Sequence, residues 1–155
     1  MKKSQRKVHI RAALLTVIFI NTACSFVRAP SPEELAMLDN PPAKVRAKQD
    51  RLTPLALQWL NETESELLIK GKALSEDDIT MARTVGVQHP DNVRVVILEQ
   101  FPMPSNDLLR VEASKYGFGS EAEGGRTMGY VIMLKQKYAD ERWILAHELT
   151  HVAQQ

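Results

Sequence analysis

The sequence predicts an α+β fold, in which N-terminal helices precede a small β-sheet and a final helix follows it. Two observations predict this class. Apolar residues recur at helical spacing before residue 90, and a run rich in β-branched residues, 93–99, comes directly after a turn-forming stretch. The last segment, from Asp140 onward, returns to helical spacing. Separate runs of helices and strands are typical of α+β proteins, and 155 residues are enough for one modest domain.

Residues 1–24 have the order of a bacterial export signal. Five basic residues come before the apolar run 12–20, and small or polar residues follow it at 21–25. The apolar run has nine residues, fewer than the ~20 that a membrane-spanning helix needs. We therefore expect an exported protein rather than one held by a permanent transmembrane anchor.

The end of this signal contains the single cysteine. Ala23 and Cys24 resemble the lipobox of bacterial lipoproteins, in which a cysteine after a small residue is lipidated and becomes N-terminal. The resemblance implies a lipid anchor at Cys24, and Ser25 in second place implies the outer membrane. The alternative is an ordinary signal that is cleaved nearby. Either way the expected location is the bacterial envelope, as a periplasmic protein or an outer-membrane lipoprotein, with membrane association through that lipid alone.

Composition excludes several function classes. Hydrophobic residues make up 44% of the chain and charged residues 25%, which excludes a disordered polyelectrolyte and a polytopic membrane protein. One cysteine excludes a disulfide framework and a multi-cysteine zinc ribbon. Removal of residues 1–24 leaves 15 basic against 19 acidic residues, a net charge of −4. Because nucleic-acid binding depends on clustered positive charge, we expect no nucleic-acid partner.

Residues 25–52 are expected to form a polar tether with one short helix, and the domain to cover 53–155. Ser31 and Glu34 give the short helix a capping box. The prolines within 40–42 should end it, because proline and the residue before it disfavour helical backbone.

Five further elements are expected before the last helix. In chain order they are a helix from Thr53 to near Gly71, a helix after Ser75 to about Val85, a strand over 93–99, a helix after Asn106 to about Tyr116, and a strand over 127–134. The glycine-rich stretch 117–126 is expected to be a loop. The strand 127–134 is apolar at nearly every position, which predicts that both of its faces are covered.

The last helix contains the pattern H-E-x-x-H, with His147, Glu148 and His151. Two histidines four residues apart lie on one face of a helix, so both imidazoles can reach one tetrahedral Zn²⁺. Glu148 can act as general base toward a water in the open coordination position. The alternative is two histidines on a solvated face with an unrelated glutamate between them.

A helical wheel places these histidines away from the core stripe of the helix. The stripe is formed by Leu145, Leu149, Val152 and Ala153. Trp143 and Ile144 flank the histidine side, and we expect them to shield it from bulk water.

Residues 143–155 resemble the active-site helix of bacterial zincin-like metallopeptidases, and in particular the zincin-like domain of toxin and contractile-injection-system proteins. The resemblance extends over about residues 90–155. It implies a zinc cofactor and a peptide or protein substrate. In zincins the strand before the helix lies at the rim of the cleft, which implies a cleft position for Tyr130, next to Gly129.

A catalytic zinc takes three protein ligands and a water, and zincins supply the third ligand from beyond the second histidine. Residues 152–155 contain no strong ligand. Upstream candidates are His89, Asp91, Glu99, Glu121 and Glu123, none singled out by its spacing. The helix also ends without a cap or basic last turn, so we expect a longer polypeptide that completes the domain.

Three functions remain open from the sequence. The first is an exported zinc metallopeptidase that hydrolyses peptide bonds with metal-activated water, using His147, His151 and Glu148. The second is a catalytically incomplete zincin-like envelope lipoprotein that serves as a binding or scaffold module. The third is an envelope lipoprotein whose helix binds metal for structure alone. The sequence predicts no oligomeric state.

Overall fold

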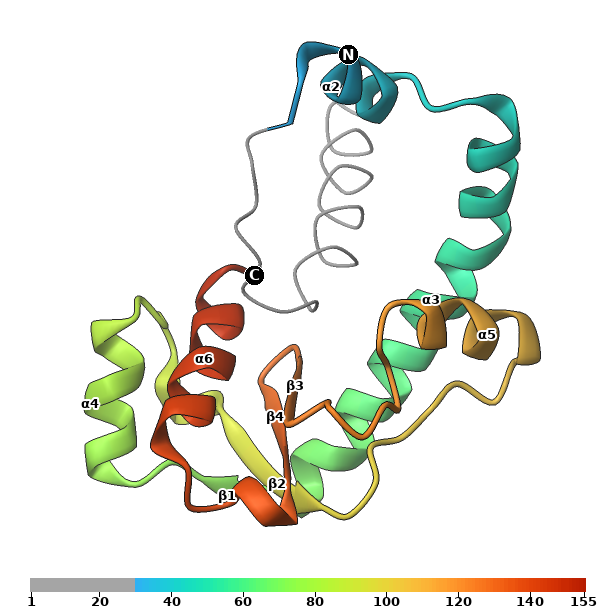
Figure 1. The fold of residues 1–155 in the computed structure, drawn as a ribbon. Coiled ribbons are helices and arrows are strands. Elements are labelled where there is room, and N and C mark those ends of the chain that lie inside the picture. The colour runs from blue at the N-terminus through green and yellow to red at the C-terminus, as the bar shows by residue number, and fades with distance from the viewer. Residues whose placement is uncertain (1–29) are drawn as a thin grey trace, which may run out of the picture.

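The computed structural model describes residues 30–155, which form helices around a four-stranded mixed sheet (Figure 1). The predicted α+β class is confirmed. Residues 1–29 lie outside the described residues, and with them the predicted export signal and Cys24.

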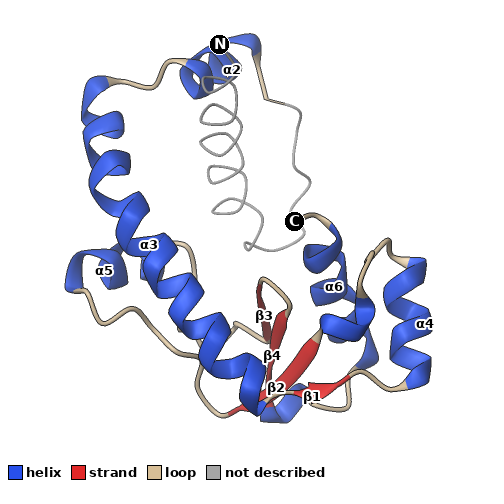
Figure 2. Ribbon diagram, turned by 180° about the vertical axis from the view of Figure 1, so that it is seen from behind, coloured by secondary structure: helices blue, strands red, loops and turns tan. Residues whose placement is uncertain are grey.

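Two helices precede the sheet, α2 (Pro32–Asp39) and α3 (Ala43–Lys70). The predicted capping box is present at the start of α2, where Ser31 Oγ accepts from the Glu34 amide at 3.2 Å and Glu34 Oε2 accepts from the Ser31 amide at 2.7 Å. No residue of α2 is buried. Helix α2 and the first turns of α3 stand away from the sheet, while the later turns of α3 cross it (Figure 2).

The expected start of α3 at Thr53 was wrong by ten residues, because the helix begins at Ala43 and passes through Pro54. Residues 43–52, expected as tether, are therefore helical. Most of them are alanine, lysine, arginine, glutamine or leucine, which have high helix propensity. Their combined preference outweighs the single hydrogen bond that Pro54 removes and the restriction it places on Thr53.

The sheet has the order β1-β2-β4-β3, with β1 (Lys72–Ala73), β2 (Arg94–Leu98), β3 (Gly125–Met128) and β4 (Val131–Lys135). Strands β2 and β4 are parallel, and the two outer pairings are antiparallel. Among the described residues β3 is therefore an edge strand.

The expectation of one strand over 127–134 was wrong, since β3 and β4 form a hairpin whose turn is Gly129 and Tyr130. Gly129 has φ of +54°, which only glycine adopts without strain. The Tyr130 amide donates to Glu64 Oε1 of α3 at 2.9 Å. Gly129 therefore reverses the chain in the middle of an apolar stretch of sequence, and the hydrogen bond to Glu64 of α3 stabilises the turn.

Both faces of β4 are covered, as its apolar sequence predicted. Ile132 and Leu134 belong to one buried cluster, with residues of α4 and α6, and Val131 and Met133 belong to another, with Leu67 of α3. All four β4 side chains are at most 2% exposed. Burial of each such side chain stabilises the fold by roughly 1.5–3 kcal/mol, so β4 ties α6 firmly to the rest of the domain.

The remaining elements are α4 (Glu76–Thr84), η1 (Pro90–Asn92), α5 (Asp107–Lys115), η2 (Gln136–Tyr138) and α6 (Arg142–Ala153). The expected caps of α4 and α5 are confirmed, since Ser75 Oγ accepts from the Asp78 amide and Asn106 Oδ1 from the Leu109 amide. Within residues 30–155 no helix is both long and apolar enough to cross a membrane.

Candidate metal centre

Helix α6 packs along β3 and β4 and next to α4 (Figure 1). Leu149 and Val152 of the predicted core stripe are buried, and Leu145 and Ala153 are partly buried. Ile144 is also buried, at 5% exposure. The stripe therefore fixes the rotation of α6 about its axis, and this rotation decides where the H-E-x-x-H side chains lie.

His147 and His151 bring their ring nitrogens together on α6. The two Nε2 atoms are 3.2 Å apart, and the rings meet edge to face with centroids 4.8 Å apart. Two nitrogens that bind one tetrahedral zinc at ~2.05 Å lie about 3.3 Å from each other. The spacing of the imidazoles therefore fits a shared zinc ion.

The expectation that Trp143 and Ile144 shield the histidines from bulk water was wrong. Trp143 is 65% exposed, and His147 is exposed as well. The reason is that α6 turns Ile144 toward the sheet, so that only Trp143 remains on the open side. Solvent and solutes can reach the histidine pair.

A second contact orients the His151 ring. Its Nδ1 lies 3.3 Å from the side-chain oxygen of Gln154, while its Nε2 faces Nε2 of His147. Burial lowers the pKa of His147, and the neighbouring His151 lowers it further, which favours the neutral form that binds metals.

Glu148 lies between the two histidines in sequence but is buried, at 4% exposure. Thr127 Oγ1 of β3 donates to Glu148 Oε2 at 2.7 Å and lies 3.1 Å from the Glu148 carbonyl oxygen. Burial raises the pKa of Glu148, and the hydrogen bond from Thr127 opposes this effect. A carboxylate with a raised pKa is suited to general-base chemistry near neutral pH.

Gly125 lies against the same carboxylate. A Cβ atom at this position would be 2.5 Å from Glu148 Oε1 and 2.9 Å from its carboxyl carbon. Such distances are well inside van der Waals contact, so only glycine leaves room for Glu148 here. Sequence reasoning missed both Gly125 and Thr127. Their two-residue spacing in the strand before the helix was the available signal, since positions i and i+2 share one face of a strand.

The described residues do not complete a three-ligand site. Among residues 30–155 no group of three His, Cys, Asp or Glu side chains is placed to hold a metal ion. The upstream candidates His89, Asp91, Glu99, Glu121 and Glu123 are therefore not brought to the histidine pair as ligands.

Glu123 has another role in the structure. Its carboxylate forms a two-point ion pair with the buried Arg126, with distances of 2.6 and 2.8 Å. Arg126 also donates to the Pro102 carbonyl at 2.6 Å, and its guanidinium carbon lies over the Phe101 and Phe118 rings, 5.2 and 4.6 Å from their centroids. This arrangement holds the loop before β3 rather than a metal.

Tyr130 lies in the β3–β4 turn, not on a strand as expected. Its side chain packs, partly buried, against the cluster on the α6 side of the sheet. A role for Tyr130 in a substrate cleft stays a prediction.

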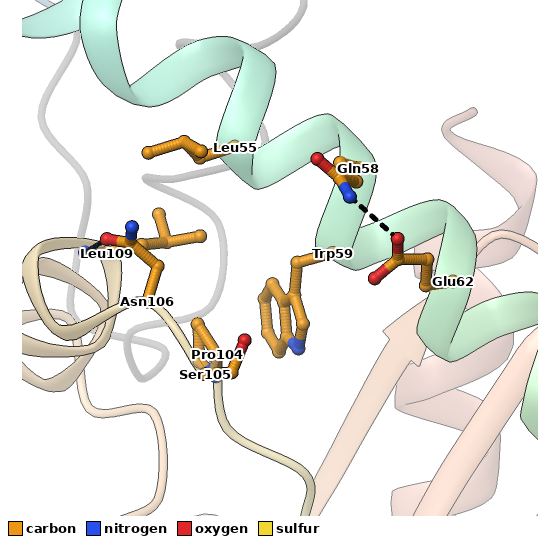
Figure 3. Close-up of a pocket in the computed structure, with 8 residues that line it drawn as sticks. All are labelled: Leu55, Gln58, Trp59, Glu62, Pro104, Ser105, Asn106 and Leu109. Atoms are coloured by element: carbon orange, nitrogen blue, oxygen red, sulfur yellow. Dashed lines mark hydrogen bonds between the residues drawn. The ribbon is translucent and has the colours of Figure 1, made fainter.

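A surface hollow of about 290 Å³ lies elsewhere, between α3 and the start of α5 (Figure 3). Trp59 forms its wall, and Gln58 donates to Glu62 at 2.8 Å along its rim. No residue of β3 or α6 lines it. The hollow is therefore separate from the candidate metal centre.

Comparison with known families gives one partial match. Residues 122–155 match the family model described as the eCIS core domain, where eCIS denotes extracellular contractile injection system. This segment contains β3, β4 and α6, and so every residue of the candidate centre. The expected similarity to contractile-injection-system proteins is confirmed to that extent, and the relation to zincin metallopeptidases stays a prediction. No curated protein and no solved structure matches the chain.

Proposed function

We propose that the protein is a zinc metallopeptidase that hydrolyses peptide bonds in a peptide or protein substrate. The observation that supports this most is the 3.2 Å spacing of the His147 and His151 Nε2 atoms on the helix that also carries the buried carboxylate of Glu148. These three groups are the ligand pair and general base that the H-E-x-x-H pattern combines on one helix.

Each residue has a distinct role in this proposal. His147 and His151 would hold Zn²⁺ through Nε2, and the metal would supply Lewis acidity toward a water and a carbonyl oxygen. Glu148 Oε2 is held by Thr127, so Oε1 is the oxygen that accepts a proton from the attacking water. The protonated Glu148 then returns that proton to the leaving amine nitrogen.

The proposal requires one ligand more than the described residues provide. A catalytic zinc takes three protein ligands, and residues 30–155 bring two together. The third has to come from outside these residues or from a side chain that moves when zinc binds. Export to the bacterial envelope, which rests on residues 1–24, is part of the same proposal.

A second candidate function is a zincin-like module that binds a partner without catalysis. The observation that favours it is the absence of a three-ligand cluster within residues 30–155. Exposed His147, its partner His151 and exposed Trp143 would then belong to a binding surface or to a purely structural metal site. The two candidates differ in whether peptide bonds are cleaved.

The deciding experiment compares the full protein with its Glu148→Gln variant. Zinc content is measured by elemental analysis, and cleavage is measured with a quenched fluorescent peptide library. The peptidase proposal predicts about one zinc per chain in both proteins, with cleavage by the wild type alone. Cleavage at the same rate by both proteins would remove Glu148 from the mechanism, and zinc binding without any cleavage would support the binding module.

A further inference from the structure

We propose that Gly125 and Thr127 of β3 form a positioning site for the Glu148 carboxylate, which sets the direction of its free oxygen. This inference rests on the proposed peptidase function. Both residues are positioning residues, because they act through Glu148.

The two residues share the face of β3 that lies against α6. Gly125 pairs with Leu134 and Thr127 with Ile132 across the hairpin, and both β4 partners belong to the cluster that contains Leu149. Arg126 and Met128, which alternate with them in β3, point to the other face, where Met128 packs with Val131. The strand therefore presents one glycine and one hydroxyl, two positions apart, to the same glutamate.

Thr127 supplies the hydrogen bond that selects one carboxylate oxygen. A hydroxyl has a single proton to donate, and Glu148 Oε2, at 2.7 Å, is closer than the Glu148 carbonyl, at 3.1 Å. The bond is thus directed to Oε2 and leaves Oε1 unengaged by Thr127. Because Thr127 is β-branched, its own χ1 rotation is restricted, which holds the donor in one direction.

Gly125 supplies the space that this orientation needs. A Cβ atom there would approach Glu148 Oε1 to 2.5 Å and its Cγ to 2.8 Å. The φ of Gly125 is not among the positive values, so its backbone conformation does not require glycine. The close approach of Glu148 is the physical reason for glycine at this position.

A purely structural role is the competing explanation, because a buried carboxylate needs a hydrogen-bond donor for stability alone. The two roles predict different kinetics. A structural role changes folding and leaves kcat of the folded enzyme intact, whereas a misdirected general base lowers kcat with little change in KM.

The test uses three variants of the full, zinc-loaded protein. Thr127→Val keeps the shape and removes the hydroxyl, Thr127→Ser keeps the hydroxyl, and Gly125→Ala adds the colliding Cβ. Thr84→Val is the matched control, since Thr84 Oγ1 only donates to the Thr80 carbonyl on α4.

We expect zinc content to stay at the wild-type level in all four proteins. Loss of one hydrogen bond to a charged group should lower kcat about tenfold in Thr127→Val, and Gly125→Ala should lose at least as much. Thr127→Ser keeps the hydroxyl, so its kcat should be close to the wild-type value. A wild-type kcat in Thr127→Val would overturn the positioning role.

A second measurement does not depend on activity. In the metal-free protein, Thr127→Val should lower the urea midpoint of unfolding in the wild-type background and have a smaller effect in a Glu148→Ala background. Equal effects in both backgrounds would overturn the Thr127–Glu148 contact itself. If the two backgrounds show energetic coupling between Thr127 and Glu148 but the zinc-loaded protein cleaves no peptide, both the proposed function and the positioning role are overturned. If the protein cleaves peptides but the two residues are not coupled, the positioning role alone is overturned.

Discussion

His147 and His151 place their Nε2 atoms 3.2 Å apart on the open side of α6. No hydrophobic contact explains this pair, because His147 is exposed and the buried stripe of the helix consists of other residues. The pair is directed by helical spacing and by the Gln154 contact to His151 Nδ1. A bound cation is the simplest use of two imidazoles whose Nε2 atoms converge in this way.

Replacement of either histidine should abolish tight zinc binding. In His147→Ala or His151→Ala one of the two ligands present in the described residues is removed, and we expect zinc affinity to fall at least a hundredfold. Competition with a fluorescent zinc chelator measures this loss. Gln88→Ala is a control on a surface residue outside the site, and equal affinity of all variants would contradict the ligand assignment.

Zinc binding should weaken in acid. Protons and zinc compete for the same imidazole nitrogen, and the affinity falls by about tenfold per pH unit for each imidazole that has taken up a proton. Burial holds the pKa of His147 below its ordinary value of 6.5. Protonation of His147 therefore lowers the zinc affinity only when the pH is below 6.5. Calorimetric titrations at pH 7.5, 6.5 and 5.5 measure the profile. An affinity that does not change over this range would contradict histidine ligation.

Replacement of the buried carboxylate should stabilise the metal-free protein at neutral pH. The pKa of Glu148 is raised above 4.5, chiefly by burial, so the folded state binds this proton more tightly than the unfolded chain. The resulting stability is fully present below pH 4.5 and is lost as the pH rises through the folded-state pKa. Glutamine keeps an acceptor for Thr127 and does not ionise.

The free energy of unfolding of Glu148→Gln should therefore exceed that of the wild type by about 1 kcal/mol at pH 8, a typical single-site effect, and by less at pH 4. Urea unfolding at both pH values measures the difference. Glu66→Gln, on the exposed surface of α3, is the control and should show no such trend. A wild-type advantage at pH 8 would contradict the assigned shift.

Loss of the buried arginine should destabilise the whole domain. Arg126 is 1% exposed and pairs with Glu123, so Arg126→Ala leaves the partly buried Glu123 carboxylate without its cation and opens space beside Phe101 and Phe118. Removal of one partner of a buried pair typically costs about 3–5 kcal/mol. By contrast, Arg142→Ala breaks an exposed pair with Asp78 and should change stability by less than about 1 kcal/mol. Similar unfolding midpoints for the two variants would refute the structural role of Arg126.

Much of the fold could be predicted from the sequence because the local signals are strong. The caps at Ser31, Ser75 and Asn106 begin helices where expected, and the β-branched run 93–99 forms β2. The misses at Pro54 and Gly129 have opposite causes. Pro54 was judged by its own preference, whereas the helix-forming residues before it decided the conformation. Gly129 was judged by its apolar neighbours, whereas its own positive φ and the contact of Glu64 with the Tyr130 amide place it in a turn.

The candidate site was predictable in its ligands but not in its surroundings. The spacing of His147 and His151 is a property of one helix, so it can be read from the chain. Thr127 and Gly125 are 21 and 23 residues from Glu148, and only the packing of β3 against α6 brings them to it. The exposure of Trp143 likewise depends on the rotation of α6, which the buried Ile144 helps to set.

Metal removal and return test the central claim most directly. The full protein is treated with a zinc chelator, dialysed, and supplied again with one equivalent of zinc, while cleavage of the quenched peptide library is followed. The peptidase account predicts that cleavage is lost with the metal and returns with it in the wild type, and that Glu148→Gln regains zinc without cleavage. Cleavage that survives complete zinc removal, or that never appears in the zinc-loaded wild type, would contradict it.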